Sequence, residues 1–421
     1  MKDEKKAPKL RFKGFTDDWE QCKLGDVGTF KGGFGFPENE QGNDSGIPFY
    51  KVSDMNDRYN ALMMKRASNY VSDSQIDINN WKPILGQNII FAKVGAAVYL
   101  ERKRKVVGPF LLDNNMMSFQ PKNADIDYIY YIFQRLHISK HAQVGTLPSL
   151  NAGELRNIEI NIPSLAEQRV VANIGVKIDQ TITLHEEKKR QLERLKSALL
   201  QKMFADKSGY LAVRFNGFCD EWKKQKLGDI VETITDYVAA GSFASLRENV
   251  IYRSEPCYAQ LIRTADLKSN FSKIAPVYVD KQAFDFLYRV SLDKESVILP
   301  NIGNCGEVYY VDPHELPYMR NVLGPNAILI RSSSLNNHFL SILFQSHNFQ
   351  KSLKLIISPN GQTKFNKTEL KRIKMVLSMD VNEQNSLSAF FKMINTAISL
   401  QEHKSNILKE LKSSLLQNMF I

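Results

Sequence analysis

Two stretches of the chain carry apolar residues at alternating spacings of three and four, which is the periodicity of a helix that packs along one seam. The first covers residues 164–204 and the second covers 380–420. Neither contains proline, and Gly175 is the one glycine in them. At 1.5 Å per residue the first would be about 60 Å long. The pattern predicts two long helices whose seams pair as a coiled coil. The expected seam residues are Ile178, His185, Leu192, Leu195 and Leu199, followed by Ile394, Gln401, Leu408, Leu411 and Leu415.

The middle of each seam is polar, with His185 in the first helix and Gln401 in the second. If the helices lie antiparallel, middle meets middle, and one shared polar layer fixes the register at some cost in stability. The alternative is that these residues lie on the helix surface, where the phase of the pattern slips. We keep both interpretations open.

Each long helix also has a start signal in the sequence. Ser164 stands three residues before Glu167, and Asp380 stands three residues before Glu383. A short polar cap followed by glutamate at the third helical position is the pattern of a capping box. We therefore expect a reciprocal capping box at both helix starts.

The long helices close two halves of the chain that share sequence. The segment RFKGFTDDWEQCKLGD begins at Arg11, and RFNGFCDEWKKQKLGD begins at Arg214, an offset of 203. The segment LKSALLQKMF at 195–204 recurs as LKSSLLQNMF at 411–420. Weaker matches lie between them in the same order. We infer a duplicated chain whose halves differ most in the middle.

Each half opens with short apolar runs that are followed by glycine-containing loops, and a helical stretch comes later. The apolar runs at 88–91 and 296–299 predict strands, and 126–136 and 337–345 predict helices. The fold class is therefore mixed α/β, or α+β: two globular domains, separated by two long antiparallel coiled-coil helices in an internal pseudo-twofold repeat. The expected boundaries are 1–162 and 206–378 for the globular domains, and 163–205 and 379–421 for the helical regions.

Charge and cysteine usage narrow the class of protein. Lys and Arg number 56 against 45 Asp and Glu, a net charge of +11, which permits a polyanionic partner. The four cysteines are isolated, which argues against a zinc site and fits a reducing cytosol. No apolar run approaches the roughly 18 residues of a membrane span, and the charged start MKDEKKAPK has no secretory pattern. We expect a cytoplasmic location without a membrane partner.

Catalytic signatures are missing from the sequence. There is no GxxxxGK[ST] phosphate loop, no HExxH, no GxSxG and no Asn-Pro-Pro-aromatic tetrad. The seven histidines do not cluster with metal-ligand spacing. The sequence therefore predicts no catalytic residue and no metal site.

Three kinds of segment suit a nucleic-acid surface. The basic run at 102–105 can contact phosphates, although a charge run is commonly just a solvated face. A basic residue lies beside a hydroxyl residue in both KVSD at 51–54 and RTAD at 263–266. The loops GTLPS and GQTK precede the closing strand of each half, where plain turns would look much the same. The candidate DNA-binding residues are Lys51, Ser53, Lys93, Arg102, Lys103, Arg104, Lys105, Thr146, Ser149, Arg263, Thr264, Asn301, Gln362, Thr363 and Lys364.

The whole doubled pattern resembles the specificity (S) subunit of type I restriction–modification systems. The resemblance rests on the motifs RFxGFxxxW, KLGD and LKxxLLQxMF and on the helix start IPSLAEQ. The start of the second long helix departs from this pattern, because it lacks the Ile-Pro pair. It implies two target recognition domains that read the halves of a bipartite, asymmetric target in double-stranded DNA. It also implies two docked methyltransferase (modification) subunits and, where present, two restriction subunits. S-adenosylmethionine, ATP and Mg²⁺ would be used by those partners, and none would be bound by this chain, which would not be catalytic.

Two other classes stay open. A coiled-coil adaptor whose lobes bind protein would share the helices and the duplication. A stand-alone nuclease or methyltransferase is disfavoured by the missing motifs.

Overall fold

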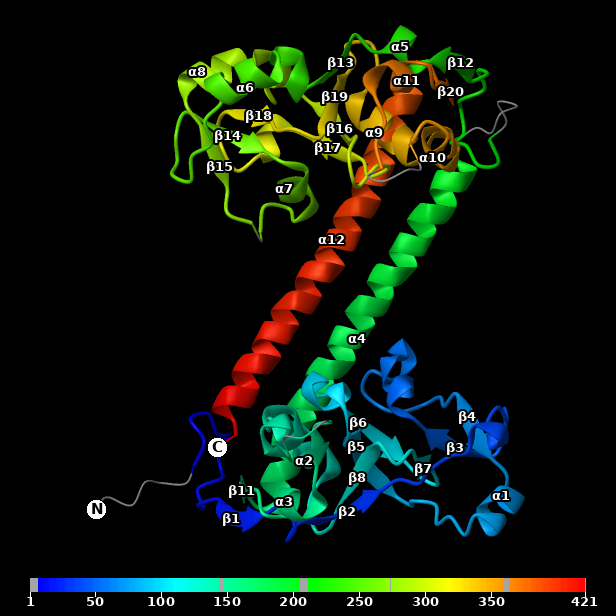
Figure 1. The fold of residues 1–421 in the computed structure, drawn as a ribbon, viewed down its shortest axis with the longest axis vertical. Coiled ribbons are helices and arrows are strands. Elements are labelled where there is room, and N and C mark those ends of the chain that lie inside the picture. Colours follow the sequence, from blue (N-terminus) through cyan, green and yellow to red (C-terminus); the bar gives the residue numbers. More distant parts are fainter. Residues whose placement is uncertain are drawn as a thin grey trace. The chain divides into compact units, whose positions relative to one another are not determined.

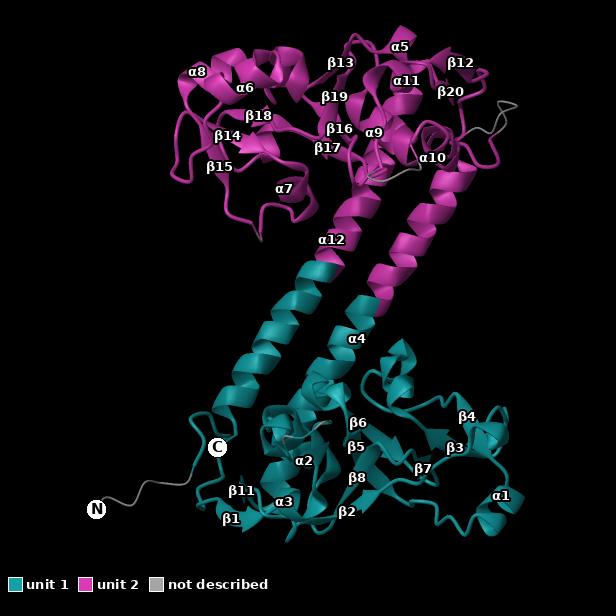
Figure 2. Ribbon diagram, in the orientation of Figure 1, with its two compact units in different colours: residues 1–186, 402–421 teal, residues 187–401 magenta. Residues whose placement is uncertain are grey.

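The computed structural model describes residues 7–143, 145, 147–204, 211–272, 274–358 and 363–420. It divides into two compact units (Figure 2). Unit 1 comprises Met1–Glu186 and Glu402–Ile421, and unit 2 comprises Glu187–Gln401. The long helices α4 (Leu165–Lys202) and α12 (Val381–Asn418) each contribute one part to each unit. Each unit therefore combines a globular part with helical segments from both halves of the duplication.

Unit 1 is built on a four-stranded antiparallel sheet, with a mixed three-stranded sheet beside it (Figure 1). The first sheet has the order β2 (Gly28–Gly32), β8 (Met116–Pro121), β5 (Gln87–Ala92), β6 (Lys103–Val107), and the second β4 (Asn69–Val71), β3 (Ile47–Tyr50), β7 (Leu111–Leu112). Two strand pairs complete the unit, β1 (Glu20–Lys23) with β11 (Glu159–Ile162) and β9 (Ala142–Gln143) with β10 (Ser149–Leu150). Its short helices are α1 (Asp73–Ile78), α2 (Ile126–Arg135) and α3 (Ala152–Arg156).

Unit 2 repeats this plan. Its four-stranded sheet has the order β13 (Thr233–Asp236), β19 (Ala327–Arg331), β16 (Ser296–Pro300), β17 (Tyr309–Val311), and its mixed sheet β15 (Val277–Val279), β14 (Ala259–Ile262), β18 (Asn321–Leu323). The strand pair is β12 (Lys223–Lys226) with β20 (Lys374–Leu377). The helices are α5 (Leu227–Ile230), α6 (Phe243–Asn249), α7 (Thr264–Lys268), α8 (Lys281–Phe286), α9 (Asn337–Gln345), α10 (His347–Lys354) and α11 (Lys367–Lys371). The mixed fold class and the internal repeat are confirmed.

The predicted strands at 88–91 and 296–299 are the inner strands β5 and β16. Successive residues of a strand point to opposite faces of its sheet, so Ile89 and Ile90 enter two different cores. Val297 and Ile298 do the same in unit 2. Burial on both faces explains why each strand is a continuous apolar run without alternation.

The repeated Met-Phe pair at the end of each long helix closes a core. Met419 and Phe420 lie in the core of unit 1, and Met203 and Phe204 lie in the core of unit 2. The Phe420 ring stacks on Tyr128 with 5.2 Å between centroids, and Phe204 takes the matching position against Phe339 at 6.2 Å. Each half of the duplication therefore ends in the core of the other unit.

The seam prediction is wrong at two of its ten residues, one in each helix. Leu195 is 49% exposed and Leu411 is 46% exposed, whereas Ser405 is buried and Lys412 is half-buried. The seam runs one residue later at these places. Its buried or half-buried members are 178, 182, 185, 189, 192, 196 and 199 in α4, and 394, 398, 401, 405, 408, 412 and 415 in α12.

Lysine stems explain the slip in phase. A lysine can cover apolar surface with its methylene groups and keep its ammonium in a polar contact. Lys412 does so in unit 1, where its ammonium lies 2.7 Å from the Asp179 carboxylate. A count of apolar letters therefore favours Leu195 and Leu411 over their lysine neighbours. The shared polar layer of His185 and Gln401 stays a prediction.

The capping-box prediction is half right. The Glu167 amide donates to Ser164 Oγ at 3.4 Å, and the Glu383 amide donates to Asp380 Oδ1 at 3.4 Å. The two glutamate side chains do not return to the helix start. Glu167 instead receives two hydrogen bonds from the guanidinium of Arg11, at 2.7 and 2.8 Å, and Glu383 receives the same pair from Arg214. A bidentate pair of this kind joins the opening motif of each half to its long helix.

The next residue in each helix start also makes a contact distant in sequence. The side-chain oxygen of Gln168, Oε1, accepts a hydrogen bond from the Asp125 backbone amide at 2.9 Å, directly before α2. Gln384 Oε1 accepts one from the Asn336 backbone amide at 2.9 Å, before α9. The Glu-Gln pair therefore connects each long helix both to the opening motif and to the buried helix of the same unit.

Gly175 is a glycine inside a long helix because Tyr131 packs directly against its backbone. A Cβ at this position would lie 2.5 Å from the Tyr131 ring. We expect Gly175→Ala to lower the free energy of unfolding by about 1–3 kcal/mol through overpacking, despite the better helix propensity of alanine. Chemical denaturation measures this change. Asn173→Ala, at an exposed position of the same helix, is the control that should not destabilise, and equal stability of the two variants would contradict the packing argument.

His338 makes unit 2 sensitive to acid. Burial lowers the pKa of His338 from 6.5 to about 4, and the charges of Lys392 and Lys196 act in the same direction. Between about pH 6.5 and pH 4 the histidine is protonated in the unfolded chain but still neutral in the folded one. Neutral His338 therefore contributes fully to the stability of the fold above pH 6.5, and this contribution is lost as the pH falls toward 4. We expect the free energy of unfolding to fall by up to about 1.4 kcal/mol per pH unit there. Denaturation of His338→Gln should show a shallower slope, and identical slopes would contradict the assignment.

Candidate functional site

Segments that the sequence singled out separately meet beyond the end of β5 in unit 1. The Lys93 amide donates to the Asn115 carbonyl at 2.7 Å, and the Leu150 amide donates to the Lys93 carbonyl at 2.9 Å. The Gly95 amide donates to the Pro148 carbonyl at 2.9 Å. The Asp113 amide reaches Tyr50, directly before Lys51, at 2.9 Å. We name residues 51–53, 93–95, 113–115 and 148–150 the first loop cluster.

Unit 2 builds the same arrangement with the same backbone bonds. Asn301 donates to the Asn326 carbonyl at 3.1 Å, and its own carbonyl accepts the Phe365 amide at 3.1 Å. Gly303 donates to the Thr363 carbonyl at 2.9 Å, and a bond of 2.8 Å joins 324 to 262. We name residues 263–264, 301–303, 324–326 and 363–365 the second loop cluster. The duplication therefore preserves this site down to its backbone hydrogen bonds.

A glycine occupies the same place in both clusters. The φ angle is +81° at Gly95 and +83° at Gly303, a backbone region that other residues rarely adopt. A Cβ at either position would meet nothing within 4 Å. The glycine is therefore needed for its conformation, and it leaves the backbone open to a close approach by a ligand.

The basic residues beside the hydroxyl residues occupy equivalent turns. The Lys51 amide donates to Asp54 at 2.7 Å, and the Arg263 amide donates to Asp266 at 2.8 Å. The Arg263 guanidinium also forms a bidentate pair with Asp266, at 2.8 and 2.7 Å, and this pair raises the pKa of Arg263. Its charge is therefore engaged within the protein. The equivalent ammonium of Lys51 donates to the neutral Gln41.

The remaining predicted side chains of the clusters differ in exposure. Ser53, Thr363 and Lys364 are exposed, and Thr264 and Ser149 are half-buried. Thr146 and Gln362 lie outside the described residues.

The two side chains that follow the inner strands have unused bonding capacity. Within the described part of the chain, the Lys93 ammonium has no ion-pair partner. The Asn301 amide nitrogen donates to the Phe365 carbonyl at 3.4 Å, whereas its Oδ1 is enclosed and has no hydrogen-bond donor among the described residues. The Lys93 ammonium is therefore available to a ligand at the first loop cluster, and at the second the exposed Lys364 likewise has no ion pair with a described residue. Asn301 keeps one N–H of its side-chain amide.

Three residues of the predicted basic run lie in β6, which begins directly after Arg102, and the members of the run face different surroundings. Lys103 is 2% exposed, and its ammonium pairs with Glu101 and donates to the Leu136 carbonyl at 3.0 Å. The expectation of a surface contact for Lys103 is therefore corrected. Burial lowers the pKa of Arg104. Arg102 donates to Asn56, and Lys105 pairs with Asp127.

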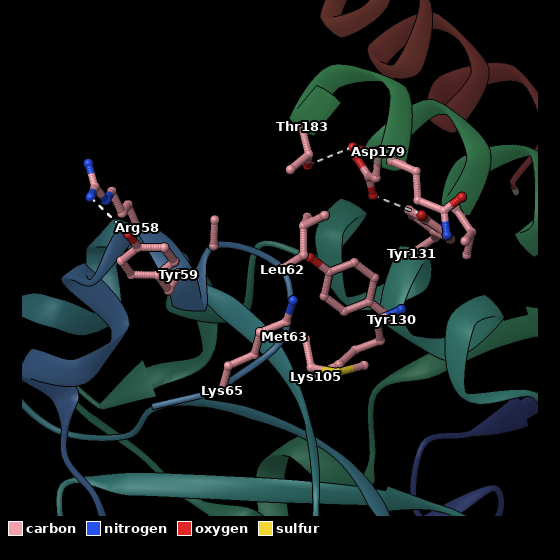
Figure 3. Close-up of a pocket in the computed structure, with 13 residues that line it drawn as sticks. Arg58, Tyr59, Leu62, Met63, Lys65, Lys105, Tyr130, Tyr131, Asp179 and Thr183 are labelled. Carbon is pink, nitrogen blue, oxygen red and sulfur yellow. Dashed lines mark hydrogen bonds between the residues drawn. The ribbon is translucent and has the colours of Figure 1, made fainter. Parts of the chain in front are cut away.

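A pocket of about 360 Å³ in unit 1 brings further basic and aromatic residues to this surface (Figure 3). Tyr59 at its rim is 45% exposed, and the Arg66 guanidinium lies 3.9 Å from its ring centroid. Arg58 donates to the Tyr59 hydroxyl at 2.9 Å. The Met64 amide binds the Lys105 carbonyl at 2.8 Å, which holds this segment against β6. Cations stacked on an exposed ring suit planar, anionic ligands such as nucleotides.

This basic and aromatic segment escaped sequence reasoning. Arg58, Tyr59, Lys65 and Arg66 lie within nine residues, which is a basic stretch with an aromatic residue in it. The sequence pattern favoured the contiguous run at 102–105 instead, because four successive basic residues form a clearer signal than basic residues spread over nine positions.

The far wall of the pocket joins α2 to α4. The Tyr131 hydroxyl donates to Asp179 at 2.8 Å, and Figure 3 shows these side chains facing each other. Burial and the Asp179 carboxylate raise the pKa of Tyr131, so its phenol stays protonated and keeps donating. This wall is structural, and the ligand-accessible charge lies on the opposite side.

The described part of the chain offers neither a metal-binding cluster nor a membrane-spanning helix. Among the described residues, no three His, Cys, Asp or Glu side chains gather in a geometry that could hold a metal ion. In the same part of the chain, no helix has both the length and the mean hydropathy needed to cross a bilayer.

The chain matches one family model twice. The family is described as the type I restriction modification DNA specificity domain, and the matches cover residues 16–194 and 219–410. Each match contains one loop cluster.

Two of the similar proteins come from Methanocaldococcus jannaschii. The type I restriction enzyme MjaVIII specificity subunit is 20% identical over 95% of this chain and 91% of its own length. The MjaIX specificity subunit is 23% identical over 55% of this chain, and the match spans about half of that relative, 54% of its length.

Solved structures share the fold. The S subunit of a type I restriction–modification system from M. genitalium matches with a TM-score of 0.61 at 14% identity, over 99% of both chains. A second structure, from work on complex assembly and conformational transition of the type I R-M system, matches with a TM-score of 0.52 at 14% identity, over 96% of this chain and 97% of that one.

Proposed function

Because the chain belongs to the family of type I restriction modification DNA specificity domains, we propose that it is the sequence-recognition subunit of such a system, in which each loop cluster reads one half of a bipartite target in double-stranded DNA. The observation that carries this proposal is the repetition of the cluster. The same four segments are joined by the same backbone bonds in both units. The family is described by its DNA specificity, and the chain contains the same site twice. Together these two observations favour two recognition sites that both bind DNA.

The clusters offer side chains that can discriminate bases. A lysine can donate to the O6 and N7 acceptors of guanine, and the N–H of an asparagine amide can donate to a base acceptor such as N7 of adenine. Lys93 and Asn301 take equivalent positions, yet they differ in charge and in hydrogen-bonding capacity. The two half-sites should therefore differ in sequence, so that the whole target is asymmetric.

The basic surface of unit 1 supplies affinity without sequence preference. Arg58, Lys65 and Arg66 add to Arg102 beside β6. Lysine and arginine that neutralise phosphates release counterions, so binding weakens as salt rises. This surface would hold the duplex backbone while the first loop cluster contacts base edges.

The long helices set the gap between the half-sites in this proposal. Each has 38 residues and would span about 57 Å at 1.5 Å per residue. Half-site spacing follows protein geometry in other bipartite DNA readers. The same helices would dock two methyltransferase subunits, and restriction subunits would join that assembly.

The chemistry belongs to the partners in this proposal. S-adenosylmethionine would bind the methyltransferase subunits, and ATP and Mg²⁺ would serve the restriction subunits. This chain would act without a cofactor and without a catalytic residue, as a subunit that directs where methyl transfer and cleavage occur.

Co-expression with the cognate methyltransferase subunit, followed by sequencing of methylated adenines across the genome, tests the proposal. We expect one motif with two unlike half-sites and an unread gap. Methylation that depends on this chain but follows a single continuous motif would contradict the two-site reading.

The alternative is an adaptor whose lobes bind protein. Binding of the purified chain to duplex DNA at two salt concentrations separates the two functions. We expect binding at low salt that weakens steeply at high salt. An adaptor would show no binding at either concentration.

A further inference from the structure

One pocket in each unit lies where the buried helix ends, α2 in unit 1 and α9 in unit 2. We name the pocket of about 360 Å³ in unit 1 the first helix-end pocket, and the pocket of about 300 Å³ in unit 2 the second. Ile132 and Ile160 line the first, while Leu343 and Met375 line the second at offsets of 211 and 215. These offsets match those of the loop clusters. The two pockets therefore occupy equivalent places in the duplication.

Both pockets have basic rims. Arg135, His137, Lys140 and His141 line the first and are exposed, as are Lys224, Lys351 and Lys374 at the second. None of these seven side chains forms an ion pair with a described residue. Among the described residues that line the two pockets, the single acidic side chain is Glu159 of the first pocket, which accepts a hydrogen bond from Gln21 at 2.7 Å. An anionic ligand would relieve the accumulation of positive charge from one arginine and four lysines.

Both floors are apolar. Ile132, Ile160 and Phe420 lie under the first rim, and Leu343 and Phe349 lie under the second. Leu355 stands at the second rim and is 83% exposed. A phosphate backbone has no apolar group to pack against these residues. An apolar side chain would cover them, and the removal of both apolar surfaces from water would favour binding.

One residue that lines the first pocket has an unused hydrogen-bond acceptor. Asn161 lines this pocket, and its Oδ1 is enclosed without a donor from the described part of the chain. An enclosed acceptor of this kind is costly unless a donor reaches it. A donor meets this atom only when the Asn161 side chain turns toward the pocket, and a peptide, unlike a DNA backbone, brings N–H groups to that place.

We propose that each helix-end pocket binds an acidic segment of a partner protein, with an apolar side chain in the floor and carboxylates against the basic rim. Because the pockets are equivalent, the chain binds two copies of one partner, one at each unit. The assignment rests on the proposed assembly with two methyltransferase subunits, and it adds a contact beside the long helices.

Charge reversal tests the pockets one at a time in the full-length chain. Arg135→Glu with Lys140→Glu alters the first pocket, and Lys351→Glu with Lys374→Glu alters the second. Lys122→Glu with Lys294→Glu changes two exposed lysines outside both pockets and is the matched control. Titration with the purified cognate methyltransferase subunit gives affinity, and native mass spectrometry gives the number of bound copies.

We expect each pocket variant to bind one copy about tenfold more weakly, and the control to bind two copies like the original chain. Equal binding by all variants overturns the pocket assignment and leaves the proposed function standing. A loss of DNA affinity without any loss of subunit affinity also overturns it, because the rims then hold phosphates. An unmodified chain that binds no methyltransferase subunit overturns the proposed assembly and the pocket assignment together.

Discussion

Deleting seven residues from each long helix should shorten the unread gap of the target by about three base pairs. Seven residues correspond to about 10.5 Å of helix, at 1.5 Å per residue, and one base pair rises about 3.4 Å. A deletion of seven also preserves the alternation of three and four along the seam. The recognised bases should stay the same, because both loop clusters lie outside the helices.

Residues 188–194 and 399–405 are the segments to remove. Their loss leaves the ion pairs of unit 1 in place, Asp179 with Lys412 and Glu186 with Lys409. It also leaves Phe204 against Phe391 in unit 2, where the ring centroids are 6.0 Å apart. Sequencing of methylated adenines in cells that carry the variant and its methyltransferase subunit gives the new gap.

Two further variants make this result decisive. Insertion of seven residues at the same places should lengthen the gap by the same number of base pairs. Deletion from α4 alone should abolish recognition, since the two helices then differ in length. A double deletion that folds, methylates and keeps the original gap would show that helix length does not set the spacing.

The repeat was the most predictable part of the structure. Strands β5 and β16 and helices α2 and α9 match the predicted stretches, because their apolar runs are long and are buried on every side. The helix starts at Ser164 and Asp380 were also visible in local spacing. The arginine partner of each glutamate was not visible in the sequence, because Arg11 lies 156 residues from Glu167 and no local spacing rule relates them.

The seam shows where patterns of apolar letters mislead. Leu195 and Leu411 satisfy a spacing of three, whereas the structure uses a spacing of four and places lysine inside. The choice depends on a long-range partner: Asp179 is available for Lys412 in unit 1. Sequence periodicity finds such a seam but does not decide its phase when leucine and lysine are neighbours.

The candidate site was predictable in parts and not as an assembly. The sequence indicates Lys93, Asn301 and the loops before the closing strands as separate candidates. The structure joins Lys93 to the loop at 148–150 in unit 1, and Asn301 to the loop at 363–365 in unit 2, through backbone hydrogen bonds. Side-chain roles diverged, because a neighbouring carboxylate decides whether a cation is free. Arg263 has Asp266 and Lys103 has Glu101, whereas the Lys93 ammonium has no ion-pair partner in the described part of the chain.

A change in one loop cluster should alter one half of the target and leave the other unchanged. We expect Lys93→Ala to relax base preference in one half-site and Asn301→Ala to relax it in the other. A lost base contact costs about 1–3 kcal/mol of discrimination, which is roughly a 5- to 150-fold loss of preference. The effect is confined to one half-site because each side chain belongs to its own unit.

Methylation motifs of the two variants, determined beside the original chain, measure this prediction. The half-site that each variant leaves unchanged is an internal control for folding and for assembly. Lys122→Ala removes an exposed charge of unit 1 outside the first loop cluster, so it should weaken binding slightly at low salt and keep both half-sites. Two outcomes would show that the loop clusters do not read bases: one substitution relaxes both half-sites, or the two substitutions relax neither. The basic segment around Tyr59 would then be the candidate for that role.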